Sequence, residues 1–154
     1  MDFARTKLLV ILAAGQLISS SVLKAQAYYD YAGTYAIDAK GERHSYKDYP
    51  RHRPPWLDDQ IKTFAPIYSY SDRAAHRQGH GFFQIAIDIK TGCAASVTVA
   101  RSTGVKTLDD SAVAALRKWC WKPGKWKEVD VPVTFTMWPK QPMPAGAVRL
   151  PSQW

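Results

Sequence analysis

Residues 81–137 constrain the fold most, because two alternating apolar runs, a helical pattern and a third alternating run follow one another there without a break. The first run has an apolar residue at every second position, which is typical of a strand with one buried face. Its apolar members are Phe83, Ile85, Ile87 and Ile89. A turn at residues 90–92 then sends the chain back through residues 96–99, which are rich in β-branched side chains, so the two runs predict a β-hairpin.

A helical pattern follows the hairpin and begins after Gly104. The apolar residues at helical spacing are Leu108, Ala112, Ala115, Leu116 and Trp119. Thr107 or Asp109 is placed to cap the N-terminus of this helix, and Arg117 lies near its C-terminus, where a cation stabilises the helix dipole. We expect the helix to end before Pro123.

The third alternating run predicts a strand over residues 128–137. Its valines and Phe135 are expected to face the helix, with Asp130, Thr134 and Thr136 on the other face. Pro132 cannot donate a hydrogen bond to a neighbouring strand, so it favours an edge position. The predicted fold is α+β, a three-stranded antiparallel sheet with one main helix packed on it (β-β-α-β). The expected core consists of Ile85, Ile87, Val97, Val99, Leu108, Leu116, Trp119, Trp121 and Phe135.

Several short motifs lie within these elements and just before them. The motifs within them are Ser102-Thr103-Gly104, Leu108-Asp109, Ala112, Ala115-Leu116, Trp119-Cys120-Trp121-Lys122-Pro123 and Val131-Pro132-Val133-Thr134-Phe135. Upstream stand Pro66-Ile67-Tyr68 and Gln78-Gly79. Together they resemble the C-terminal domain of TonB over residues 64–138. Two positions depart from that family's pattern, since Ser69 replaces a proline and Asp72 replaces an alanine.

The resemblance implies how a partner binds. In the family the third strand runs along an edge of the sheet, and an extended peptide from a partner adds beside it. Exposed main-chain groups then provide affinity, and neighbouring side chains provide selectivity. The residues expected at this edge are Asp130, Pro132, Thr134 and Thr136. The implied partner is the periplasmic segment of a TonB-dependent outer-membrane transporter, and an open edge would also allow a homodimer.

Two cysteines, Cys93 and Cys120, are expected to meet at one end of the sheet. Cys93 opens the second strand, and Cys120 lies just past the helix that runs back antiparallel to that strand. Both positions are usually polar and variable in the TonB family, so two thiols together favour a disulfide in an exported protein. A pair of half-buried free thiols is the alternative, and metal binding is less favoured.

Residues 1–27 are predicted to be a signal peptide, with basic residues before an apolar run and small residues at Ala25-Gln26-Ala27. Cleavage there would leave Tyr28 first and place the protein in the periplasm. The alternative is a retained inner-membrane anchor, but the apolar run is shorter than the roughly 20 residues that span a bilayer. An exported protein is not expected to bind nucleic acid. The mature chain would carry 18 basic and 12 acidic residues, a formal charge of +6.

Two further regions flank the expected domain. Residues 28–63 form an arm rich in tyrosine, arginine and proline, with a short helix expected after Pro55, and residues 139–154 form a proline-rich tail. The arm tyrosines are Tyr28, Tyr29, Tyr31, Tyr35, Tyr46 and Tyr49. They are expected either to pack the arm onto the sheet or to form a basic, aromatic binding patch.

The sequence offers no set of residues that predicts catalysis. The four histidines His44, His52, His76 and His80 lack the further ligands of a structural zinc site. Ser102 belongs to a turn and stands outside any Gly-x-Ser-x-Gly motif, and Asp109 is explained by its place near a helix N-terminus. We therefore expect no enzymatic activity, no metal and no cofactor.

Two hypotheses of function follow. The first is a periplasmic TonB-like interaction module that binds an outer-membrane transporter or another envelope partner by strand addition, as part of transmembrane transport. The second is an envelope-structural protein whose basic, aromatic arm binds peptidoglycan or lipopolysaccharide. The salt dependence of binding would discriminate the two hypotheses. A charge-driven contact with a polymer weakens as ionic strength rises, whereas an added strand should persist.

Overall fold

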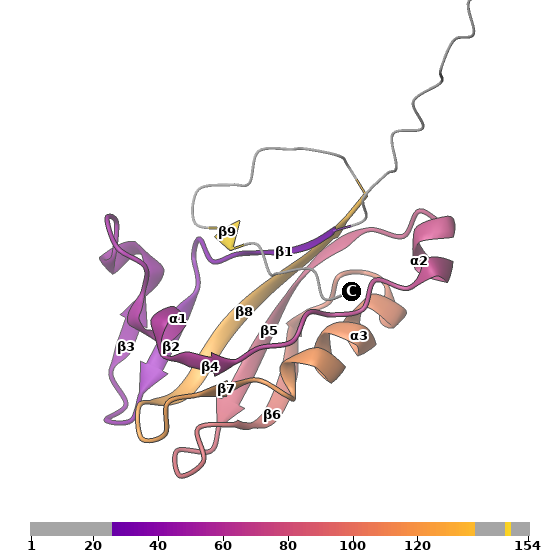
Figure 1. Ribbon diagram of the computed structural model, residues 1–154. Coiled ribbons are helices and arrows are strands. Elements are labelled where there is room, and N and C mark those ends of the chain that lie inside the picture. The colour runs from indigo at the N-terminus through magenta and orange to yellow at the C-terminus, as the bar shows by residue number, and fades with distance from the viewer. Residues whose placement is uncertain (1–25, 138–146, 149–154) are drawn as a thin grey trace, which may run out of the picture.

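The computed structural model describes residues 26–137 and 147–148 (Figure 1). Seven strands form one sheet in which every pairing is antiparallel. They are β1 (Gln26–Asp30), β2 (Tyr35–Asp38), β3 (Arg43–Ser45), β5 (Gly79–Ile87), β6 (Ala94–Arg101), β8 (Trp126–Thr136) and β9 (Ala147–Val148). Two short strands, β4 (Gln60–Lys62) and β7 (Cys120–Trp121), pair separately, and the helices are η1 (Tyr46–Asp48), α1 (Pro55–Asp58), α2 (Tyr70–Ala74) and α3 (Lys106–Leu116).

The three strands predicted from alternation are β5, β6 and β8, and the α+β class is confirmed. β5 pairs with β6 as a hairpin and with β8 along Gly79–Ala86, so β5 lies between them. The expected number of three strands is wrong, because β1, β2 and β3 from the N-terminal side and β9 from the C-terminal side join the same sheet. The arm strands were missed because they are short and carry tyrosines in place of aliphatic residues.

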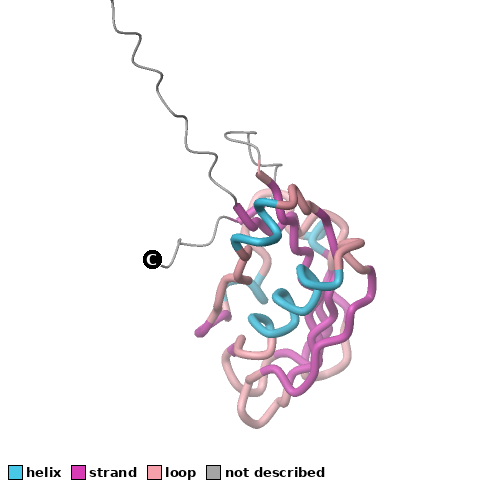
Figure 2. Tube along the Cα trace, turned by 90° about the vertical axis from the view of Figure 1, so that its right-hand side faces the viewer, coloured by secondary structure: helices cyan, strands magenta, loops and turns pink. Residues whose placement is uncertain are grey.

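α3 packs on one face of the sheet, as Figure 2 shows. The apolar residues of the strands and of the helix form this contact. β5 buries every second residue from Gly81 to Ile87, and β8 buries Val129, Val131, Val133 and Phe135. α3 buries Leu108, Ala112, Ala115 and Leu116 against them. Each fully buried valine, leucine, isoleucine or phenylalanine side chain among them stabilises the fold by about 1.5–3 kcal/mol.

Two tryptophans after α3 bond to the arm and to the residue that follows it. The Trp119 indole nitrogen donates to the Phe64 carbonyl at 2.8 Å, and the Trp121 indole nitrogen donates to the Trp56 carbonyl at 2.8 Å. The Trp119 and Trp121 indoles are both buried. Tryptophan is tolerated in a core when its N–H has a partner, and for these two side chains the backbone carbonyls of Phe64 and Trp56 provide it.

The start of α3 differs from the prediction. Val105 is the N-cap residue and makes no side-chain cap hydrogen bond. Asp109 instead accepts hydrogen bonds from the Thr103 backbone N–H at 2.8 Å and the Thr103 hydroxyl at 2.7 Å. Thr107 donates its hydroxyl to Asp72 at 2.6 Å. The turn before α3 and the α2 region are therefore held by the residues expected to cap the helix.

Most of the expected core residues are buried, but Val99 is 40 % exposed, so its place in the expected core is wrong. Val99 pairs with buried Phe83 and therefore points to the helix face. Its strand, β6, pairs with β5 alone among the described residues, so one side of Val99 has no neighbouring strand to cover it. Val97 is partly buried and packs against the core.

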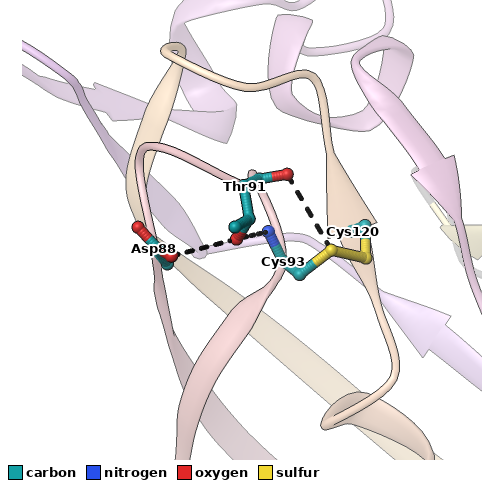
Figure 3. Close-up of a disulfide and its surroundings, with 4 residues drawn as sticks. All are labelled: Asp88, Thr91, Cys93 and Cys120. Carbon is teal, nitrogen blue, oxygen red and sulfur yellow. Dashed lines mark hydrogen bonds between the residues drawn. A yellow bond between two sulfur atoms is a disulfide. The ribbon is translucent and has the colours of Figure 1, made fainter.

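Cys93 and Cys120 form a disulfide with an S–S length of 2.07 Å (Figure 3). The two cysteines also face each other as an antiparallel bridge. Hydrogen bonds on both sides fix this contact: Ala94 N–H donates to the Trp119 carbonyl at 3.0 Å, and Trp121 N–H donates to the Gly92 carbonyl at 2.7 Å. The predicted pairing at one end of the sheet is present in the structure.

The expected signal peptide and C-terminal tail fall almost wholly outside the described residues. Within them, Gln26 and Ala27 pair with Thr136 and Phe135, and Ala147–Val148 pairs with β1. Among residues 26–137 and 147–148 we find no helix with the length and apolar content needed to span a bilayer.

Candidate partner-binding edge

β8 was expected to be an open edge, and this expectation is wrong. Its first side pairs with β5 from Glu128 to Phe135. Its second side pairs with β1 at Thr134–Thr136 and with β2 at Trp126–Val129. Figure 1 shows β8 running through the middle of the sheet with β5 on one side and the arm strands on the other. The chain itself therefore occupies the side at which a partner strand was expected.

Pro132 marks a break in the pairing of β8 and not an edge of the sheet. Tyr28 pairs with Thr134 and Ala36 pairs with Val129. The arm therefore advances by eight residues where β8 advances by five, which leaves three arm residues outside the ladder. The three extra residues form a turn in which the Thr34 N–H and hydroxyl both bond to the Tyr31 carbonyl, at 3.0 and 2.7 Å. Because Pro132 has no N–H, the arm can leave the ladder there without stranding a donor.

The arm is held on β8 by buried aromatic packing. Tyr29 is fully buried, and its ring lies 5.4 Å from the Trp119 ring in an edge-on contact. Tyr31, Ala36 and Trp56 are also buried. Burial raises the pKa of both tyrosines well above the usual range, because the phenolate would lose its hydration. Of the two interpretations of the arm, packing onto the sheet describes Tyr29 and Tyr31.

The four residues expected to line the edge instead contact neighbouring strands. The Asp130 carboxylate accepts a hydrogen bond from the Tyr35 backbone, and Pro132 pairs with Phe82. The Thr134 hydroxyl lies 2.6 Å from Nδ1 of His80. Thr136 pairs with Gln26, and its hydroxyl donates to the Gln78 side chain at 3.3 Å. They belong to the interior of the sheet, on the face opposite α3.

Asp130 is the most perturbed carboxyl group on that face. Burial raises its pKa to about 6, and the nearby charge of Glu128 also raises it, while the Tyr35 N–H and Arg43 act in the opposite direction. Gln84, which pairs with Asp130, donates to Glu128 at 2.9 Å and to the Tyr35 hydroxyl at 3.2 Å. This polar group links the arm, β5 and β8.

β6 is the long strand of the sheet that has one pairing partner among the described residues. The register slips at both of its ends, leaving Ala95 and Ala100 unpaired with β5, and such bulges are typical of edge strands. Between the bulges, residues 96–99 pair regularly and carry small or β-branched side chains. The other outer strands, β3 with three residues and β9 with two, offer shorter ladders.

The two departures from the TonB pattern lie next to each other. Ser69 is the N-cap of α2, accepting the Asp72 N–H at 3.0 Å and donating to its carboxylate at 2.6 Å. Asp72 is buried and also bonds to Thr107 and Arg77. The hydrogen bonds from Ser69 and Thr107, followed by that of Arg77, lower the pKa of Asp72. The Ser-x-x-Asp spacing of a helix N-cap is the sequence signal for this contact.

One group of metal-ligand residue types lies on the β2–β3 hairpin. Ligand atoms of Asp38, Glu42 and His44 lie within 4.8 Å of one another. Asp38 accepts the backbone N–H groups of Lys40 and Glu42, and its other oxygen lies 3.1 Å from Nε2 of His44. The His44 hydrogen bond is the main cause of a lowered pKa of Asp38. These contacts close the hairpin turn, which accounts for the grouping.

A comparison with protein families matches residues 65–138 to the family described as Gram-negative bacterial TonB protein C-terminal. A search of curated proteins found no significant match. A search of solved structures also found no significant match. The matched residues contain α2, β5, β6, α3, β7 and β8, and the arm strands precede them.

Proposed function

Because residues 65–138 belong to the TonB C-terminal domain family, we propose that this chain is a protein-interaction module of the Gram-negative cell envelope that binds a partner by strand addition. The proposed role is binding without catalysis, in the periplasm. The partner we propose is the periplasmic segment of a TonB-dependent outer-membrane transporter, by analogy with the family. In this proposal the chain acts in transmembrane transport as an accessory or a competitor.

The observation that carries the proposal is the pairing of the sheet. β8 is paired on both sides, so a partner strand would have to displace the buried arm in order to bind there. β6 pairs on one side, and its central residues 96–99 are regular and uncharged. We therefore propose that the partner adds beside β6. The bulges at Ala95 and Ala100 would limit the added strand to about four residues in register.

The second hypothesis, a basic and aromatic arm that binds a cell-wall polymer, has less support. Tyr29 and Tyr31 are buried, so neither ring is available to a ligand. The Arg43 guanidinium packs over the Tyr35 ring, with its central carbon 3.8 Å from the ring centroid. Arm residues that contribute to the core and to the sheet argue for a structural role.

The test is a titration of the ¹⁵N-labelled protein with a peptide that covers the periplasmic segment of such a transporter. Strand addition should perturb amide signals of residues 94–101 and leave those of residues 128–136 nearly unchanged. Two proline variants, Val97→Pro and Thr98→Pro, provide a matched pair. Successive N–H groups of a strand point to opposite sides, so one variant breaks the β5 ladder and the other removes an outward donor.

The variant that keeps the wild-type melting temperature should lose most of its peptide affinity. If that variant binds as well as wild type, β6 is not the binding edge. Perturbations centred on β1, β2 and β8 would instead show that the peptide displaces the arm. Antiparallel pairing of β6 with a second copy would also occupy this edge, and it would appear as a molecular mass that doubles with concentration in sedimentation experiments.

A further inference from the structure

A second surface lies where the segment after α1 runs beside the segment after α3. Gln60 pairs with Trp121 and Lys62 pairs with Cys120. The Trp119 indole then donates to the Phe64 carbonyl, and the Ser111 hydroxyl donates to the Ile67 carbonyl at 2.6 Å. Two segments far apart in sequence, residues 60–71 and 111–127, thus lie side by side over one flank of the domain, where Figure 1 shows β4, β7 and α3.

These two segments are basic without any acidic residue. They contain Lys62, Arg117, Lys118, Lys122, Lys125 and Lys127, and no aspartate or glutamate. Lys122 forms an ion pair with neighbouring Asp59 at 2.8 Å. Within the described part of the chain, Lys62, Arg117 and Lys118 form no ion pair, so their charges remain uncompensated by contact. Like charges held together create a local positive potential that attracts anions.

Exposed apolar side chains lie on the segment that carries Lys62. Ile61 is 60 % exposed and Ile67 is 77 % exposed. The ammonium groups of Lys62 and Lys118 lie 5.3 and 5.7 Å from the centroid of the same Phe64 ring, so both cations flank one aromatic side chain. We call Ile61, Lys62, Phe64, Arg117 and Lys118 the basic strip. Its mixture of uncompensated cations and exposed apolar groups is that of surfaces that lie on a charged bilayer.

We propose that the basic strip binds the surface of a bilayer that contains anionic phospholipids. Lys62, Arg117 and Lys118 contact headgroup phosphates, and Ile61 enters the boundary between headgroups and acyl chains. Ammonium groups on flexible stems reach phosphates without requiring a fixed geometry, and the exposed Ile61 side chain on the same segment as Lys62 favours the boundary of a bilayer over an acidic peptide. The proposal is independent of strand addition at β6, because none of the five strip residues belongs to that strand.

The experiment measures binding of the full mature protein to vesicles by co-sedimentation at low salt. One vesicle is pure phosphatidylcholine and the other contains about a third phosphatidylglycerol. Each basic residue near such a surface contributes about fivefold in affinity, so Lys62→Gln/Arg117→Gln/Lys118→Gln should bind anionic vesicles roughly a hundredfold more weakly. The control, Lys40→Gln/Lys47→Gln/Lys90→Gln, removes the same charge from exposed sites elsewhere and should bind within about threefold of wild type.

Ile61→Ser separates insertion from charge and should weaken binding several-fold at unchanged net charge. Melting curves check that each variant folds. If the triple strip variant has a lower melting temperature than wild type, vesicle binding by Arg117→Gln alone and the salt dependence of wild-type binding provide the test. Equal losses in the strip and control variants would refute a local site and indicate a net-charge effect. Absent binding of wild type to anionic vesicles, or binding to purified peptidoglycan alone, would also overturn the proposal.

Discussion

Removing the Cys93–Cys120 disulfide should lower the free energy of unfolding by about 3.5 kcal/mol. The cysteines are separated by 27 positions, and the chain-entropy relation for a loop of that length gives this value at 25 °C. Backbone hydrogen bonds already join the two segments, from Ala94 to Trp119 and from Trp121 to Gly92. The native contact should therefore survive reduction, and the loss should arise in the unfolded chain, which gains freedom.

Urea unfolding measures this loss for three samples: oxidised wild type, reduced wild type, and Cys93→Ala/Cys120→Ala. Reduced wild type keeps both sulfur atoms, so its difference from the double variant isolates packing around Cys120, which is largely buried. The first comparison should give about 3.5 kcal/mol with a larger m-value, because a chain without the cross-link exposes more surface on unfolding. A loss below about 1 kcal/mol would refute the entropic argument.

Three further changes test other parts of the structure. Gly92 has a φ of 74°, and an added Cβ would lie 2.1 Å from the Trp121 carbonyl oxygen, so Gly92→Ala should cost at least about 2 kcal/mol. Gly124→Ala is the matched control, since Gly124 has a φ of 77° and an added Cβ would meet nothing within 4 Å. It should cost about 1 kcal/mol in chemical unfolding. Equal costs of the two glycine substitutions would show that the clash at Gly92 is not the cause. Asp130→Asn should stabilise the protein by roughly 1 kcal/mol at pH 7.5, after discounting for solvent screening. The raised pKa of Asp130 means that the wild type loses stability as pH rises from about 4 through about 6, so the gain should vanish at pH 4; a gain independent of pH would contradict this cause. Trp119→Ala should cost about 3–5 kcal/mol, because the indole is buried against Tyr29 and bonded to Phe64, and a melting temperature within about 2 °C of wild type would contradict that packing.

The domain was predictable because its elements carry strong periodic signals. Alternation in β5 and β8 and helical spacing in α3 place Ile85, Leu108 and Phe135 in one core, as the structure shows. The cysteine pairing followed from the direction of α3 relative to β6. Val99 was misplaced because alternation identifies the face of a strand but not how far neighbouring elements cover it.

The edge was mispredicted because Pro132 has two physical explanations. A missing N–H is tolerated at a sheet edge, and it is equally tolerated where the partner strand turns away. The structure has the second arrangement, since the arm makes a turn opposite this position. The strands of the arm could not be predicted from periodicity, because the arm contributes isolated aromatic residues such as Tyr29 and Trp56 to the core. The burial of these residues depends on long-range contacts.

Native-state amide hydrogen exchange tests the central claim most directly, namely that the arm closes β8 and leaves β6 as the open edge. Amides of β2 and β8 that bond to each other should exchange only through global unfolding, with the same free energy as the core amides of β5. Alternate amides of residues 96–99 should exchange much faster, because they point away from β5. Arm amides that exchange orders of magnitude faster than those of β5 would contradict the claim and would make β8 the available edge.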